Sequence, residues 1–184
     1  RDFGDHGRTV HHQFVPIAYS QPVVELLQAQ QPSGGGDAPE DVLAGFTIAR
    51  TEFNWRSNLR LMLFVADAPA HGCYPGGGDS HPSGRCPDQL PPHLNLEETT
   101  RSLAQEHHVD LLFCRLNGTT ARMENLFGEV YSSGGGFGVL PITSGPAAFR
   151  SAILSTISSS ILKVLSPENV SGLQTFSGGT ASSL

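Results

Sequence analysis

The chain has 184 residues, of which 38% are hydrophobic, with a formal net charge of −6 and a sequence pI near 5.7. This length allows one ordinary domain with a buried core. The acidic balance argues against nucleic acid as the main partner, and the absence of an apolar run of about 18 residues excludes a membrane span.

The first third of the chain predicts one strand and two helices. Residues 10–19 are typical of a strand, and the proline inside this segment places it at a sheet edge. Residues 21–30 predict a short helix. A glycine loop follows, made of Gly34, Gly35 and Gly36. Asp37 then occupies a suitable N-cap position for a helix over residues 39–53.

An unbroken apolar run, LMLFVA at residues 61–66, predicts the central strand. Because no polar residue interrupts it, we expect both faces of this strand to be covered. The run stops at Asp67, and a carboxylate at the carboxyl end of a buried strand lies where open α/β sheets bind ligands. The loop over residues 68–93 is rich in Pro, Gly and His, and loops of this length are either functional or disordered.

The second half of the chain alternates strands with helices. In order, the predicted elements are a helix capped by Asn95, a strand at 109–116, a helix with its apolar stripe from Met123 to Tyr131, a strand at 137–142 and a helix capped by Ser144. This alternation predicts an α/β fold with a mostly parallel sheet and helices on both faces. The small, polar residues from 166 to 184 predict a disordered tail.

The three cysteines indicate a reducing compartment. Cys114 lies in an apolar, strand-like run and is expected to be a buried thiol. Cys73 and Cys86 could pair, but reduced thiols are the simpler interpretation, so a cytoplasmic location is expected and an extracellular one stays open.

The loop over residues 68–93 also offers a weak zinc pattern. His71, Cys73, His81 and Cys86 carry atoms that zinc accepts, but their spacing matches no standard zinc finger. A zinc-dependent enzyme built on this loop is therefore only an alternative. The sequence contains no nucleophile or phosphate-binding motif, and we predict that the chain is not an enzyme.

Three segments have the residues and the order of a known family. They are GGGDAPEDVLAGF at 34–46, WRSNLRLMLFVADAPAHG at 55–72 and LLFCRLNGTTARM at 111–123. Together they resemble the von Willebrand factor A domains of alpha-kinase-associated and hemicentin-like proteins. The resemblance implies a doubly wound, Rossmann-like sheet in a partial domain over residues 1–165, lacking its first strand and most of its second. An alpha-kinase domain accompanies such domains in some relatives, and this chain offers no kinase motif.

The resemblance also implies a divalent cation, usually Mg²⁺, at the carboxyl end of the sheet. Asp67 matches the aspartate that follows the fourth strand of the family. The glycine loop matches a loop that carries a threonine ligand, but Asp37 and Ala38 stand where that threonine is expected. Asp37 is therefore a second candidate ligand. Because no Asp-x-Ser-x-Ser segment occurs, we expect cation binding by this chain to be weak or absent.

These features predict a protein-binding module. An acidic residue of a protein partner would complete the coordination of a cation on Asp67, while the glycine loop and His71 line the crevice. A scaffold domain whose cation site has lapsed is an alternative, favoured by the departure at Asp37 and Ala38. The zinc-dependent enzyme using loop 68–93 is the third candidate.

Overall fold

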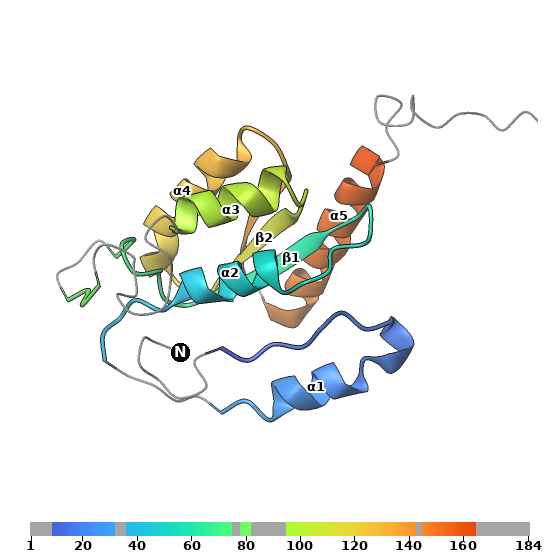
Figure 1. Ribbon diagram of the computed structural model, residues 1–184, viewed down its shortest axis with the longest axis horizontal. Coiled ribbons are helices and arrows are strands. Elements are labelled where there is room, and N and C mark those ends of the chain that lie inside the picture. Colours follow the sequence, from blue (N-terminus) through green and yellow to red (C-terminus); the bar gives the residue numbers. More distant parts are fainter. Residues whose placement is uncertain (1–8, 32–35, 75–77, 82–94, 143–144, 165–184) are drawn as a thin grey trace, which may run out of the picture.

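The structure is a computed structural model that describes residues 9–31, 36–74, 78–81, 95–142 and 145–164. These residues form a parallel sheet with helices on both of its faces (Figure 1). In chain order the elements are η1 (Ile17–Tyr19), α1 (Gln21–Gln28), α2 (Val42–Thr51), β1 (Leu61–Ala66), α3 (Leu96–Gln105), β2 (Asp110–Arg115), η2 (Gly118–Thr120), α4 (Ala121–Tyr131), β3 (Phe137–Pro141) and α5 (Gly145–Val164). The predicted mixed α/β class is confirmed.

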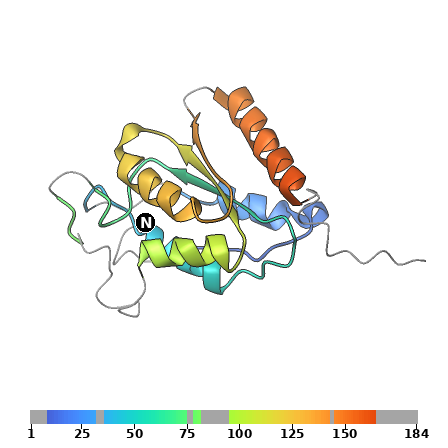
Figure 2. The ribbon, with the colours of Figure 1, turned by 90° about the horizontal axis from the view of Figure 1, so that it is seen from above.

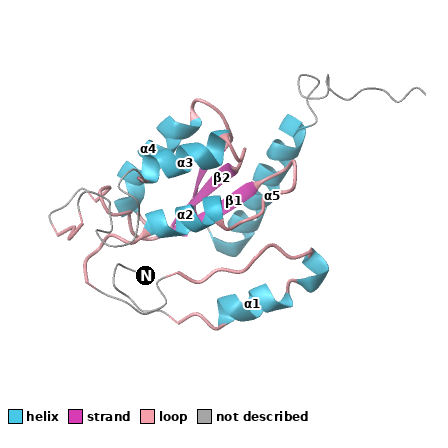
Figure 3. Ribbon diagram, in the orientation of Figure 1, coloured by secondary structure: helices cyan, strands magenta, loops and turns pink. Residues whose placement is uncertain are grey.

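The sheet has three parallel strands in the order β1-β2-β3. Figure 3 shows the neighbouring strands β1 and β2. Leu61 of β1 pairs with Asp110 of β2, and Leu111 of β2 pairs with Phe137 of β3. All three apolar runs predicted as strands therefore form strands. Among the described residues, β1 has a strand partner on one side only, so its outer edge is open.

The core lies between the sheet and the layer formed by α2, α3 and α4, whereas α5 lies on the opposite face (Figure 2). Phe46 of α2 stacks on Phe127 of α4 with ring centroids 5.1 Å apart. Phe64 of β1 meets Phe46 and Phe113 edge to face, each at 5.2 Å. Such aromatic contacts contribute beyond the apolar area that they bury, and they fix α2 against β1.

The prediction that β1 is covered on both faces was wrong. Leu63 and Val65 are 42% and 51% exposed, although Phe64 between them points into the core. On β2, the corresponding outward side chains of Leu112 and Cys114 are buried. The difference arises because α5 contacts β2 and β3 and leaves the edge strand uncovered.

The prediction of an edge strand over residues 10–19 was also wrong. Residues 9–16 form no regular element, and η1 follows them. Phe14 packs against Phe53 and Trp55, with ring centroids 5.2 Å and 5.0 Å away. These aromatic contacts attach the segment to the residues after α2 without a sheet neighbour, although Phe14 stays 55% exposed, and the proline of the segment has no N–H to donate to a strand. The following helix, α1, forms as predicted but buries none of its residues.

The sequence predicts Asp37 as the N-cap of α2, but in the structure the N-cap is Asp41. The Asp41 side chain accepts a hydrogen bond from the Ala44 N–H at 3.1 Å. The helix starts late because Glu40 is held in extended backbone, where it forms a parallel bridge with Ala70. Its N–H donates to the Pro69 carbonyl at 2.9 Å, and its carbonyl accepts from the His71 N–H at 3.3 Å, so both backbone groups pair with the segment after β1.

Other local predictions can be compared directly with the structure. Asn95 caps α3 by accepting from the Glu98 N–H at 2.8 Å, as predicted, and Cys114 is a buried thiol. The predicted cap Ser144 and the predicted tail at 166–184 lie outside the described residues. No helix in the described ranges combines the length and the apolar character that a bilayer span requires.

Candidate functional site

The predicted site residues fall into two neighbouring places. Asp67 is exposed at the carboxyl end of β1 and lines a cleft along the open edge of that strand. Asp37 and His71 do not line this cleft and lie together in a polar cluster behind its rim. Gly36 has φ 134°, a conformation that favours glycine, whereas Gly34 and Gly35 lie outside the described residues.

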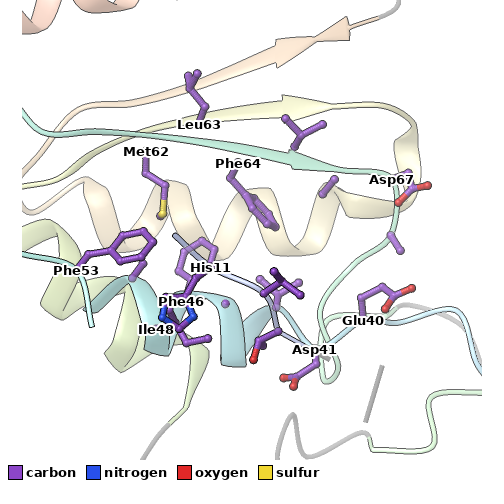
Figure 4. Close-up of a pocket in the computed structure, with 18 residues that line it drawn as sticks. His11, Glu40, Asp41, Phe46, Ile48, Phe53, Met62, Leu63, Phe64 and Asp67 are labelled. Atoms are coloured by element: carbon purple, nitrogen blue, oxygen red, sulfur yellow. The ribbon is translucent and has the colours of Figure 1, made fainter. Parts of the chain in front are cut away.

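The cleft runs between β1 and α2 and has a volume of about 430 Å³. Its floor is apolar, and Figure 4 shows Phe46 of α2, Phe53 from the segment after α2, and Met62 and Phe64 of β1 lining it. Residues 9–11 of the N-terminal segment contribute to the lining. A cleft with an apolar floor and a few polar groups at one end is the usual form of a ligand site.

Three carboxylates gather at the polar end of the cleft. Asp67 follows β1, and Glu40 and Asp41 come from the loop that leads into α2 (Figure 4). The Asp67 backbone carbonyl accepts hydrogen bonds from Asn117 and Thr119, which follow β2. The backbone at the end of β1 is therefore fixed, while the Asp67 carboxylate stays in contact with solvent.

The polar cluster is built from three separate segments of the chain. Asp37, His71 and Asp79 each offer one metal-ligand atom, and these atoms all lie within 4.8 Å of one another. His71 and Asp79 are in contact through Nδ1 and Oδ1 at 2.8 Å, and their side chains are only 2% and 7% exposed. The imidazole of His81 lies next to that of His71, with ring centroids 5.3 Å apart.

Backbone hydrogen bonds hold the carboxylates of this cluster. Asp79 accepts from the Gly72 N–H at 2.8 Å and from the His81 N–H at 2.9 Å. Asp37 accepts from both the backbone N–H and the hydroxyl of Ser80, the hydroxyl at 2.7 Å. The cluster therefore joins the segment that begins at Gly36 and Asp37 to the segments on either side of residues 75–77.

The pKa of Asp79 lies below its ordinary value of 3.8. Burial raises this pKa, but the hydrogen bonds from His71, Gly72 and His81 stabilise the carboxylate and outweigh the cost of burial. Asp79 is consequently ionised at neutral pH, and it supplies negative charge to a site that is largely shielded from water.

The cleft and the cluster share the same two loops. Besides its bridge to Glu40, Ala70 donates its N–H to the sulfur of Met123 at 3.3 Å, which anchors the turn after β1 on α4. The His71 N–H donates to the Glu40 carbonyl at 3.3 Å. A change at the cluster therefore acts directly on the loop that carries the acidic end of the cleft.

Sequence reasoning missed four of the residues that shape these two places. Glu40 and Asp41 are predicted to belong to a first helical turn, but Glu40 instead bridges to Ala70, and both residues line the cleft. Asp79 and Ser80 lie in the irregular loop, where no periodic pattern indicates which residues meet the glycine loop. The acidic residues after the glycines, in the segment DAPED at 37–41, were the sequence signal for the cleft.

Comparison with known proteins found a relative that matches part of the chain. No protein-family profile matches the chain. The alpha-protein kinase vwkA of Dictyostelium discoideum is 38% identical over 63 residues. The matched segment covers 33% of this chain and 10% of the kinase, so the chain corresponds to only a small part of that relative.

Proposed function

We propose that this chain is a protein-binding module of the von Willebrand factor A type, which binds an acidic residue of a protein partner through a divalent cation. The observation that supports this function best is the position of Asp67, which shares one cleft with Glu40 and Asp41 at the carboxyl end of a parallel strand. The succession of β1, α3, β2, α4, β3 and α5, with helices on both faces, supports a doubly wound sheet for the module.

The donor atoms at the acidic end of the cleft fit Mg²⁺. This ion prefers oxygen ligands, keeps several of its waters and needs only one or two protein carboxylates. Asp67 is the proposed ligand because its carboxylate is exposed at the cleft, which Glu40 and Asp41 also line. Without a cation the Asp67 carboxylate would repel an acidic partner, so cation binding would control which partner is accepted.

Asp37 has a different part in this proposal from the one expected of it. Its carboxylate accepts hydrogen bonds from Ser80 and lies in the cluster with His71, away from the lining of the cleft. Asp37 would thus position the glycine loop instead of supplying a ligand beside Asp67. Because Asp37, an expected ligand, is hydrogen-bonded to Ser80 instead, a second candidate function is a scaffold domain without a working cation site.

The partial relative does not extend the proposal to catalysis. The name of vwkA describes a protein kinase, and the match covers 10% of that protein. The proposed function of this chain is partner binding, and any kinase activity belongs to the relative.

Binding of selected peptides tests the proposal. A displayed peptide library is selected on the purified chain with Mg²⁺ present, and the recovered peptides are measured by calorimetry with Mg²⁺ and with EDTA. Because the sequence contains no Asp-x-Ser-x-Ser segment, we expect this binding to be weak. The recovered peptides should require an Asp or Glu, be released by EDTA and bind at least tenfold more weakly to Asp67→Asn. Glu97→Gln, on an exposed helix surface, is the matched control.

Two results would count against the cation-dependent module. One is peptide binding that is equally strong in EDTA and in the Asp67→Asn variant. The other is a melting temperature and a calorimetric signal that do not respond to Mg²⁺ at any concentration tested, which would favour the scaffold domain.

A further inference from the structure

We propose that Asp37, His71 and Asp79 form a binding site for a zinc-class transition-metal ion, separate from the cleft at Asp67. The three ligand atoms lie within 4.8 Å of one another and come from three segments that the fold brings together. His71 is 4% exposed, and the cluster lies behind the rim of the cleft instead of in it. No sequence pattern links these three residues.

The donor set selects the kind of metal. One imidazole nitrogen and two carboxylate oxygens suit Zn²⁺, which binds such atoms at about 2.0–2.2 Å in a tetrahedron. The edge of that tetrahedron is about 3.4 Å, so ligand atoms that lie within 4.8 Å of one another have to approach by about 1.4 Å at most. Mg²⁺ prefers an all-oxygen shell and retains water, so a histidine in the set favours Zn²⁺ over Mg²⁺.

The ligands are already held for metal binding. The Asp79 carboxylate is fixed by the N–H groups of Gly72 and His81, and that of Asp37 by Ser80. The ion would take over the contact that now joins His71 to Asp79.

The fourth coordination position of the tetrahedron has a candidate ligand nearby, His81. The ring of His81 lies 5.3 Å from that of His71, measured between centroids. Either this imidazole or a water completes a four-coordinate site. A bound ion would cross-link the glycine loop to the segments around His71 and Asp79, and would therefore stabilise the loop that carries Glu40.

Zinc binding to the intact chain tests this site. Tag-free protein is stripped with a chelator and titrated with Zn²⁺ against a competing indicator, and with Co²⁺, whose visible spectrum reports four-coordinate N/O ligation. We expect one ion per chain, a higher melting temperature with Zn²⁺ and little competition from a large excess of Mg²⁺.

Substitutions assign the site to these side chains. We expect His71→Gln and Asp37→Asn each to weaken zinc binding at least tenfold, while His107→Gln, at the other end of the sheet, leaves it unchanged. Asp37→Asn matters most, because it removes a ligand without breaking the contact between His71 and Asp79. Circular dichroism of each variant establishes that it is folded.

The outcomes also separate this site from the others considered. Asp67→Asn should keep zinc binding intact even if it abolishes Mg²⁺-dependent partner binding, so each proposal can fail alone. A Cys73→Ser, Cys86→Ser double variant should bind zinc normally, and loss of binding in it would overturn the proposal in favour of thiolate ligands. Unchanged zinc affinity in Asp37→Asn and His71→Gln, or binding well below one ion per chain, would also overturn it.

Discussion

The substitution Asp79→Asn measures how much the polar cluster contributes to stability. The wild-type carboxylate accepts three hydrogen bonds of 2.8–2.9 Å, from His71, Gly72 and His81. An asparagine has about the same size but only one acceptor oxygen, so its NH₂ group must face at least one of these donors. The side chain is 7% exposed, so water has little room to replace the lost partner.

The size of the effect follows from the number of bonds lost. A hydrogen bond to a charged group contributes about 1.5–3 kcal/mol, and leaving a buried donor unpaired adds to the loss. We therefore expect the free energy of unfolding to fall by about 3 kcal/mol. For a chain of this size, the melting temperature would fall by about 6–12 °C.

The assay is urea and thermal unfolding followed by circular dichroism, with EDTA present so that metal binding does not contribute. Glu97→Gln breaks an exposed ion pair with Arg101 and should change stability by less than about 1 kcal/mol. A loss below about 0.5 kcal/mol in Asp79→Asn would refute the interpretation that the cluster holds the two loops together.

The pH dependence gives an independent check with a defined sign. The pKa of Asp79 in the folded chain is lower than its ordinary value of 3.8, so its ionised form stabilises the fold. The stability difference between wild type and Asp79→Asn should be complete above pH 3.8 and should shrink as the pH falls through the lowered pKa. A difference that grows on acidification would contradict this assignment.

Three further predictions test the fold around the site. Phe113→Ala should lower the free energy of unfolding by about 3–5 kcal/mol because the ring is fully buried. Leu63→Ser, on the uncovered face of β1, should lower it by about 1 kcal/mol or less. Equal losses measured by urea unfolding would contradict the one-sided burial of β1. Asp41→Ala removes the N-cap of α2 and should lower the free energy of unfolding by about 1 kcal/mol, measured in the same way. An unchanged free energy of unfolding would favour Asp37, the cap predicted from the sequence. Burial raises the pKa of the Cys73 and Cys114 thiols. Peptide mapping of native protein treated with iodoacetamide at neutral pH should therefore find both thiols unmodified. Rapid labelling of either thiol would show that its surroundings open to solvent.

Much of the fold could be predicted because its signals are local. Apolar runs gave the three strands, and the four-residue spacing from Met123 to Tyr131 gave α4, whose buried face is the predicted one. The errors arose where a distant contact decides the outcome. An apolar run cannot reveal which helix covers each face, and α5 covers β2 and β3 but leaves Leu63 and Val65 of β1 exposed.

The site was harder to predict for the same reason. Asp67 could be located at the end of a strand, because the geometry of parallel sheets places such residues at one edge. The partners of Asp37 could not be located, since Asp79 and Ser80 belong to an irregular loop without a period. The bridge between Glu40 and Ala70 is also a long-range feature, and it moves the start of α2 to Asp41.

That bridge has a consequence for binding kinetics. Because backbone hydrogen bonds join Glu40 to the segment around Ala70, the two loops that form the acidic rim are held together without a ligand. A preorganised rim spares the ligand the entropy cost of ordering two loops. Association with such a rim should be a single fast step, with differences in affinity among ligands expressed mainly in how slowly they leave.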